Sequence, residues 1–335
     1  MLDEVPGYSL NALLNADFSP RKPMLGSWLL ERSLNMIHAP AGLGKSMACL
    51  SLSLALAGGG EFLGWKAPKP RRVLYVDAEM DPSDLRERTE DLLKASGMTD
   101  AQINDAGHNL QVIPQQGLDD DRKLPDLKAE PDEAKEILGD WCDAFEPDLV
   151  ILDNLSTLAE VEDENSAGGF AFVQTLGDFL KSQGVAVLLV HHDRKGFSGS
   201  ESFRGSSKLD ALLDVRWGFS RPEKRIPVSS VCFTLECHKC RPRRGEDVRS
   251  FTVGLVDNDD HPTWESSDNP IPPKVQQYVD AVRTRLYGTG KAIAEALGTT
   301  PVDVSRRRKK AIELGAITDE ELTECLAEGK TKDDF

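Results

Sequence analysis

A regular alternation of short apolar runs and longer amphipathic segments most constrains what this chain folds into. Apolar runs at 34–40, 71–80, 147–155 and 184–193 predict strands, and the segments between them have helical periodicity. Strands that are apolar on both faces and separated by helices form a parallel sheet covered by helices on each side. The sequence therefore predicts an α/β fold. The predicted helices are 45–57, 82–97, 131–145 and 168–182.

Beyond Asp193 the pattern changes. Residues 214–220, 228–240 and 248–256 read as strands with little helix between them, and they predict an antiparallel extension of the sheet through hairpins. The proline-rich stretch SDNPIPPK then marks a boundary. The predicted units are an N-terminal arm (1–24), a core (25–266), a linker (267–273), a small second domain (274–326) and an acidic tail (327–335).

Composition excludes several classes of protein. With 39% hydrophobic and 29% charged residues, the chain has the composition of a soluble globular protein. The start MLDEVPGYSL lacks a basic region followed by an apolar run, and no apolar stretch is long enough to span a membrane, so we expect a cytoplasmic protein. Six scattered cysteines indicate reduced thiols. The net charge of −16 repels nucleic acid unless positive charge is gathered locally.

The stretch HAPAGLGKSMACL, residues 38–50, lies between a predicted strand and a predicted helix. The backbone amides of such a turn and the positive end of the helix bind phosphates, and a lysine adds charge. The pattern GxxxxGK[ST] is met except at Ala39, where a glycine is usual; if that position needs a positive φ, alanine costs about 1–2 kcal/mol. We interpret the stretch as an ATP site in which Lys45 reaches the β and γ phosphates and Ser46 binds Mg²⁺. The alternative is a glycine-containing turn with a chance lysine. The predicted nucleotide contacts are Ala41, Gly42, Leu43, Gly44, Lys45, Ser46 and Met47.

Acidic residues follow two of the predicted strands. Asp153 ends the run LVILD and is the predicted second Mg²⁺ ligand, whereas Asp148 before it reads as a loop charge. Glu79 lies just past the run VLYVD, where parallel-sheet enzymes place groups that face the ligand. A carboxylate there can orient and activate the attacking water. Asp77 is the alternative for this role, and a second alternative is that both residues cap the next helix.

The run VAVLLVHH ends in His191 and His192. A neutral imidazole at a strand end can hydrogen-bond a γ-phosphate and transmit its loss to the loop that follows; the alternative is a structural pair of histidines. The next segment is rich in glycine and serine and carries three basic residues that we expect to contact a nucleic-acid backbone. They are Arg194, Lys195 and Arg204.

The segment CHKC, Cys237 to Cys240, has the spacing of a zinc ligand pair. A structural zinc site needs four ligands, and no second CxxC or HxxxH pattern is present. Cys232 and His238 are too close along one predicted strand to complete a tetrahedron. The sequence therefore does not favour zinc.

Taken in order, the segments PAGLGKS, YVDAE, VILDN, VHHDRKG, FRGSS with DVRW, and KCR resemble the RecA-type ATPases of the RepA helicase group of plasmids and phages. The resemblance covers about residues 25–256 and includes the phrase EFLGW. It implies a RecA-like fold and a ring, commonly of six subunits, with ATP between neighbours and single-stranded DNA passing through the core.

The same resemblance assigns roles to residues. Glu79 matches the catalytic glutamate of the group and His192 its γ-phosphate sensor. Arg216 matches an arginine finger that acts across the interface, which is worth on the order of 10³ to 10⁵ in rate, although a structural salt bridge is the alternative. Lys239 and Arg241 resemble a Lys-x-Arg pair with the same task. The sequence departs from the group at 160–169, EVEDENSAGG, which is acidic where a DNA-contacting loop is usefully basic.

The segment GKAIAEALGTTPVDVSRRRKKAIELGAI predicts two helices joined by a short turn. Thr300 predicts an N-cap, Pro301 the first helical position and Asp303 a Thr-x-x-Asp capping pattern. The apolar faces of the two helices are predicted from Ile293, Ala294, Leu297, Ala311, Ile312 and Leu314.

This segment resembles the winged helix-turn-helix modules of DNA-binding proteins. Residues 291–315 hold six basic and three acidic residues, so positive charge gathers here. We expect the second helix to bind duplex DNA through its basic side chains, while the stem of Arg308 covers the core; the alternative is a solvated helix in a protein-binding module. The predicted DNA contacts are Arg306, Arg307, Lys309 and Lys310.

The chain ends in Asp333, Asp334 and Phe335. This tail is either a solvated end or an anchor for replication proteins. The function predicted from the whole sequence is a Mg²⁺-dependent, ring-forming ATPase, a DNA helicase or replication ATPase of a phage or plasmid. The alternatives are an ATP-switched DNA-binding regulator and a partner-recruiting ATPase without unwinding activity.

Overall fold

The structure is a computed structural model. It describes residues 7–159, 171–193, 207–223, 225–242, 248–257, 261–267, 273–313 and 317–330. Within this part of the chain, no helix is both long enough and apolar enough to cross a membrane.

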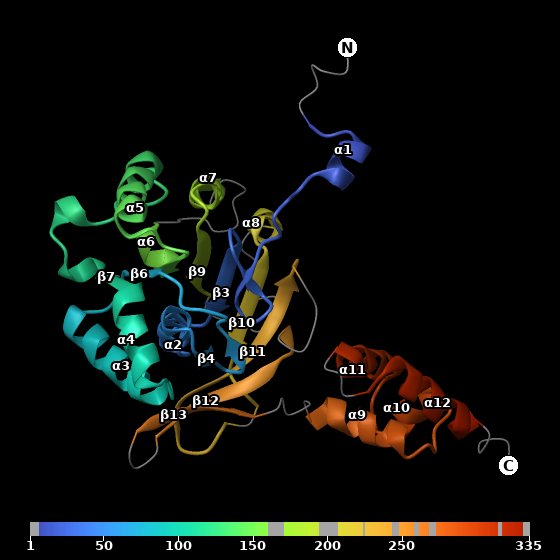
Figure 1. The fold of residues 1–335 in the computed structure, drawn as a ribbon. Helices are drawn as coiled ribbons and strands as arrows, with labels where there is room; N and C mark the ends of the chain where they lie inside the picture. Colours follow the sequence, from blue (N-terminus) through green and yellow to red (C-terminus); the bar gives the residue numbers. More distant parts are fainter. Residues whose placement is uncertain are drawn as a thin grey trace.

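A nine-stranded sheet forms the centre of the large domain (Figure 1). Adjacent strands from β10 to β7 are parallel, and β11, β12 and β13 extend the sheet in antiparallel pairs. This topology confirms the predicted fold class. In spatial order the strands are β13 (Pro262–Ser267), β12 (Phe251–Asp257), β11 (Ser229–Cys240), β10 (Val215–Ser220), β3 (Leu34–Ala39), β9 (Ala186–His192), β8 (Leu149–Asp153), β6 (Val73–Asp77) and β7 (Leu110–Pro114).

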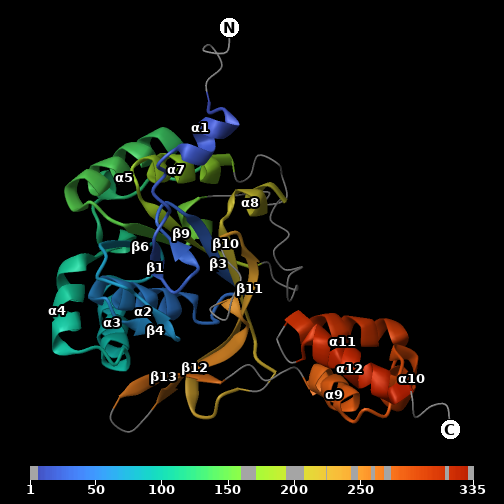
Figure 2. The same cartoon turned by 45° about the vertical axis from the view of Figure 1, so that its right-hand side comes forward.

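Helices cover both faces of the sheet (Figures 1 and 2). Alternate residues of one strand enter different cores: Val73 and Tyr75 pack with the cluster under α2, α3 and α4, and Leu74 and Val76 with the cluster under α5, α6, α7 and α8. Strands that are buried on both faces explain the continuous apolar runs of the sequence. The helices of this domain are α1 (Leu10–Asn15), α2 (Lys45–Gly58), α3 (Pro82–Ala95), α4 (Asp100–Asn109), α5 (Pro131–Phe145), α6 (Leu155–Leu158), α7 (Ala171–Ser182) and α8 (Ser207–Leu212).

An aromatic cluster joins the N-terminal part of the domain to the sheet. The rings of Trp28, Trp65 and Trp217 lie with centroids 5.1–5.7 Å apart, so each ring packs against the other two. Trp28 and Trp65 come from two small hairpins, which hold strands β1 (Pro23–Leu25) with β2 (Leu29–Leu30), and β4 (Glu61–Phe62) with β5 (Trp65–Lys66).

The C-terminal unit is a separate helical bundle with its own apolar core (Figures 1 and 2). The last strand of the sheet ends at Ser267 and the first helix of the unit begins at Pro273. As predicted, two helices joined by a short turn form its centre, with Ile293, Ala294 and Ala311 fully buried. The helices are α9 (Pro273–Arg283), α10 (Gly290–Ala296), α11 (Pro301–Glu313) and α12 (Asp319–Lys330).

The end of this unit differs from a winged module. Among residues 273–313 and 317–330 there is no strand, and the helix α12 follows α11. The Thr318 hydroxyl accepts a hydrogen bond from the Glu321 amide at the start of α12, and Leu322 and Cys325 are buried against the other helices. An N-cap followed by apolar residues at helical spacing explains why this segment forms a helix.

The cap of α11 is as predicted at Thr300, whose hydroxyl accepts a hydrogen bond from the Asp303 amide at 3.2 Å. The Asp303 carboxylate instead accepts a hydrogen bond from the Thr299 hydroxyl.

In the large domain, Ala39 ends β3 in extended conformation and is not among the residues with positive φ. The strain expected from the missing glycine therefore does not arise.

Candidate functional site

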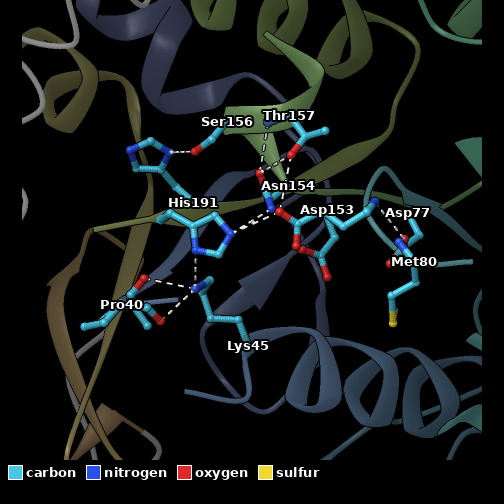
Figure 3. Close-up of polar contacts among 12 residues, drawn as sticks. Pro40, Lys45, Asp77, Met80, Asp153, Asn154, Ser156, Thr157 and His191 are labelled. Carbon is cyan, nitrogen blue, oxygen red and sulfur yellow. Dashed lines mark hydrogen bonds and ion pairs between the residues drawn. The ribbon is translucent and has the colours of Figure 1, made fainter. Parts of the chain in front are cut away.

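The carboxyl ends of four parallel strands meet at one edge of the sheet. Asp77 is paired in register with Asp153, and Ala39 with His192. The side chains that follow these strand ends therefore come from distant parts of the sequence but face a common space above the sheet (Figure 3). This is the position at which open α/β sheets bind ligands.

The turn from β3 into α2 has the backbone of a phosphate-binding loop. Gly42 and Gly44 have φ values of 73° and 97°, in the left-handed region that favours glycine. A Cβ atom at Gly44 would also lie 2.3 Å from the Cγ1 atom of Val231. Gly44 precedes the first residue of α2, so the positive end of that helix points at the turn.

Lys45 is buried, with 4% of its surface exposed. Its ammonium donates hydrogen bonds to the carbonyl oxygens of Ala39 (2.9 Å) and Pro40 (3.0 Å), and lies 2.9 Å from Nδ1 of His192 (Figure 3). Burial lowers the pKa of Lys45, and the negative charge of Asp153 opposes that shift. The ammonium is thus held between the phosphate-binding loop and the end of β9.

Asp153, at the end of β8, is 2% exposed and accepts hydrogen bonds from the hydroxyls of Tyr75 and Ser46. Burial raises the pKa of Asp153, although both hydrogen bonds and the nearby Lys45 favour the carboxylate. The structure therefore brings together Ser46 and Asp153, the two residues predicted to hold Mg²⁺.

Glu79 and Asp77 have different surroundings. The Asp77 carboxylate is buried and accepts hydrogen bonds from the amides of Glu79 (3.0 Å) and Met80 (2.7 Å), so it caps the turn after β6. The Glu79 carboxylate points toward the shared space and lies 3.3 Å from the Thr157 hydroxyl and 3.4 Å from Nε2 of His192. Of the two acids, Glu79 alone is placed to reach a ligand.

The pKa values of these acids are shifted in opposite directions. Burial raises the pKa of Asp77 to about 6, and repulsion by Asp153 adds to that effect. Burial also acts to raise the pKa of Glu79, but hydrogen bonding to Asn154 and the proximity of His192 outweigh it, and the pKa is lowered. Glu79 is therefore a carboxylate at neutral pH, as a residue that orients water requires. Asp148 lies away from these acids and pairs with Arg71 at 2.7 Å.

His192 occupies the centre of the site. Its ring contacts Lys45 through Nδ1, and its Nε2 atom lies 2.9 Å from the Asn154 amide and 3.4 Å from Glu79. His191 points the other way and contacts the Ser156 hydroxyl at 3.3 Å. Of the two histidines, the strand pleat places His192 beside the phosphate-binding lysine.

These residues fit ATP and Mg²⁺. Nothing lies within 4 Å of the position that a Cβ atom would take at Gly42, so the loop leaves room for a ligand against its backbone. Lys45 would hold the phosphates, and Ser46 and Asp153 would hold Mg²⁺. Bound MgATP supplies a phosphoanhydride bond whose cleavage the metal assists by neutralising charge.

The structure places Arg216, predicted as an arginine finger, inside its own subunit. Its guanidinium donates a hydrogen bond to Asp210 (2.8 Å) and lies 3.1 Å from Nε2 of His38, and the residue is 8% exposed. This is the salt-bridge alternative for Arg216, so a role across an interface stays a prediction that requires the side chain to leave these partners.

Lys239 and Arg241, the predicted Lys-x-Arg pair, both hold α8. Lys239 donates to the carbonyl oxygen of Asp210 and Arg241 to that of Ala211. Their neighbours Cys237 and Cys240 are half-buried, and no three His, Cys, Asp or Glu side chains form a metal-ligand group in the described part of the chain.

The basic residues of α11 divide into two groups. Arg306, Arg308 and Lys309 are exposed, whereas Arg307 contacts the Asp303 carboxylate at 2.6 Å and the Lys274 carbonyl at 3.2 Å. Arg307 and Arg308 follow the buried Val304 by three and four residues, so the two positions flank the apolar face of α11. Arg307 is engaged by these two contacts, and its role as a DNA contact stays a prediction. The expectation that the stem of Arg308 covers the core also stays a prediction, since its charge lies near the buried Tyr278. Lys310 is half-buried, 3.9 Å from Glu236 of β11.

Two groups of predicted contacts lie outside the described residues. They are the basic residues Arg194, Lys195 and Arg204, and the end of the tail with Asp333, Asp334 and Phe335. Their roles stay predictions, as does the effect of the acidic stretch at 160–169.

Residues 5–197 match the family model described as an AAA domain, and this span is more than half of the 335-residue chain. The chain belongs to this AAA domain family. It is also similar to the crystal structure of the flagellar accessory protein FlaH from Methanocaldococcus jannaschii, with 14% sequence identity, a TM-score of 0.44, and coverage of 71% of this chain and 90% of that chain.

Membership of the AAA family supports ATP binding and hydrolysis by the core, as the sequence predicted. The matched span contains the phosphate-binding loop, Glu79, Asp153 and His192. It ends at residue 197, before Arg216 and the C-terminal unit.

Sequence reasoning missed two polar residues of the AAA site. Asn154 and Thr157 contact each other and Glu79, and Asn154 also contacts His192. Asn154 follows Asp153 directly at the strand end, which was an available signal. Thr157 gave none, because its place depends on the short helix α6 turning back over the sheet.

The raised pKa of Asp77 makes a testable prediction. The pKa of this carboxyl group is about 6 in the folded protein, against an ordinary value of 3.8. At a pH between these two values, the folded state binds a proton that the unfolded state has lost. The free energy of unfolding therefore falls as the pH rises through this range. Asp77→Asn keeps an oxygen that accepts both amide hydrogen bonds but cannot ionise. We expect this variant to gain about 1–3 kcal/mol over the wild type between pH 4 and pH 7 in urea denaturation. The exposed control Asp178→Asn should show no such change. If the difference in free energy of unfolding between Asp77→Asn and the wild type does not vary with pH, the raised pKa is contradicted.

Proposed function

We propose that this AAA protein is a ring-forming ATPase that acts on DNA, as a helicase or replication ATPase of a phage or plasmid. The observation that carries the ATPase proposal is the meeting of Lys45, Glu79 and His192 at the carboxyl ends of β3, β6 and β9. Lys45 binds phosphate, Glu79 orients water, and His192 lies between them, where it is able to respond to the terminal phosphate.

Two substitutions separate binding from hydrolysis. Lys45→Ala removes the buried ammonium and should abolish hydrolysis, mostly through loss of ATP binding. Glu79→Gln keeps the shape of the side chain but not its charge, so ATP binding should stay within about threefold of wild type while turnover falls by about 10²-fold or more. Fluorescent-nucleotide binding and phosphate release measure the two effects. Full turnover in Glu79→Gln would remove Glu79 from this role.

Assembly with further copies of the chain is supported by α1. None of its residues is buried, and Leu10, Leu13 and Leu14 are 70%, 48% and 73% exposed on a six-residue helix. So short a helix is marginal alone, and an exposed apolar stripe marks an interaction site. Figures 1 and 2 show α1 projecting beyond the rest of the large domain. Contact between two different surfaces of successive copies is the arrangement that closes a ring.

Charges on this stripe should therefore break the assembly. Leu13→Asp combined with Leu14→Asp should shift the protein toward monomers in size-exclusion chromatography with light scattering, because the apolar contact is lost. Asn11→Asp adds charge to the same helix outside the stripe and should leave the oligomer intact. If the double variant keeps the wild-type mass, α1 does not hold the ring.

Duplex DNA binding is proposed for α11, whose exposed surface carries Arg306, Arg308 and Lys309 on a chain with a net charge of −16. The contrast with Arg307 provides a matched pair of variants. Arg306→Ala should weaken DNA binding and reduce the slope of log affinity against log salt by about 0.9, because one phosphate contact is lost. Arg307→Ala should leave the slope unchanged and lower the thermal stability of the C-terminal unit.

Fluorescence anisotropy on duplex DNA across a salt series measures both effects. If neither variant changes the slope, α11 serves a protein partner, which favours the partner-recruiting alternative. Strand displacement in the presence of ATP then separates a helicase from an ATP-switched regulator, because the regulator binds DNA without unwinding it.

A further inference from the structure

Four polar side chains form a connected group beside the nucleotide site. His38, one residue before the end of β3, is 1% exposed, with Nδ1 2.8 Å from the Asp193 carboxylate and Nε2 3.1 Å from the Arg216 guanidinium. Arg216 in turn donates to Asp210 of α8 at 2.8 Å. The group therefore crosses from β9 through β3 to β10 and α8.

The hydrogen bonds fix the proton on His38. A guanidinium only donates, so Nε2 of His38 accepts from Arg216. The proton of the neutral ring then lies on Nδ1 and is donated to the Asp193 carboxylate. A single imidazole that accepts on one side and donates on the other thus joins an arginine to an aspartate.

One end of this group adjoins the nucleotide site. Asp193 follows His192 directly, and its own amide donates to the Ala39 carbonyl at 2.9 Å. That carbonyl also accepts from the Lys45 ammonium. Hydrogen bonds thus restrain both the backbone and the side chain of Asp193. Because His192 is the preceding residue, these bonds also restrain the position of its ring beside Lys45.

The other end holds α8 and β10. The Asp210 carboxylate accepts a hydrogen bond from Arg216, and the Asp210 carbonyl oxygen accepts one from Lys239. The chain between Asp193 and the start of α8 carries the predicted DNA contacts, and both described flanks of that chain are tied to this one group.

The sheet leaves room for the histidine. Gly218 is paired in register with His38, and a Cβ atom there would lie 3.1 Å from Cε1 of His38 and 2.2 Å from Nε2 of His238. A side chain at Gly218 would therefore displace the two rings. The absence of one at this point of β10 permits the contact between His38 and Arg216.

We infer that His38 is a positioning residue that holds Asp193, and through it the ring of His192, in a fixed relation to Arg216 and α8. This role deepens the proposed ATPase function and rests on it. His38 does not touch the nucleotide; it acts by setting where His192 and Arg216 stand.

Replacement of His38 tests this role kinetically. His38→Leu removes both hydrogen bonds, and we expect kcat for ATP hydrolysis to fall about 10- to 100-fold while KM stays within about threefold. His38→Gln offers an amide donor and a carbonyl acceptor, and should recover kcat to within about fivefold of wild type. Met36→Ala damages packing on the same face of β3 and should leave kcat unchanged. Wild-type kcat in His38→Leu, or an equal loss in Met36→Ala, would overturn the inference.

A second measurement does not depend on turnover. The chain has only six histidines, so ¹⁵N-histidine spectra of the whole protein are simple, and the His38 signals are those lost in His38→Gln. We expect His38 to be neutral with its proton on Nδ1, and its signals to shift when MgATP is added. A proton on Nε2 would overturn the inference. If the wild-type protein hydrolyses no ATP but His38 carries its proton on Nδ1, the proposed ATPase function is wrong while the contacts of His38 with Asp193 and Arg216 are supported.

Discussion

The buried ammonium of Lys45 is the interaction on which the rest of the site depends. A charge at 4% exposure is stable only if polar groups replace its water, and here two carbonyl oxygens of the phosphate-binding loop and the His192 ring do so. These contacts tie β3 to β9 at their carboxyl ends. The acids of β6 and β8 then lie near a positive charge, which opposes the cost of burying Asp153. Bound phosphate would take over the role of these partners.

At this edge of the sheet, some side chains face the ligand site and others form hydrogen bonds that stabilise the backbone. Asp77 and Glu79 are two positions apart, yet one caps a turn and the other points into the site. His191 and His192 are adjacent, and the strand pleat sends them to opposite sides. His38 extends the polar contacts beneath the site to Arg216, so the nucleotide site and α8 are joined by hydrogen bonds and not by apolar packing alone.

Much of the fold was predictable because its signals are local. Continuous apolar runs gave the buried parallel strands, and the helices at 45–57, 82–97 and 131–145 were predicted within three residues of their observed ends. β7 was missed because an edge strand is half exposed and lacks a continuous apolar run. The resemblance to winged modules gave no sign of α12, although the capping threonine and the apolar spacing of that segment were local signals for a helix. Ala39 raised a concern about strain that its extended backbone removes.

The sequence by itself determined the strand order along the chain, the phosphate-binding loop and the acids at the strand ends, because each depends on residues that are neighbours in sequence. Only the tertiary structure decided which of two neighbouring side chains reaches the site, that Arg216 is bound to His38 and Asp210, and that Arg307 contacts the Lys274 carbonyl of another helix. Such choices depend on the register between strands and on the packing of helices from distant segments. Register and helix packing are set when the whole sheet assembles, and no local sequence pattern encodes them.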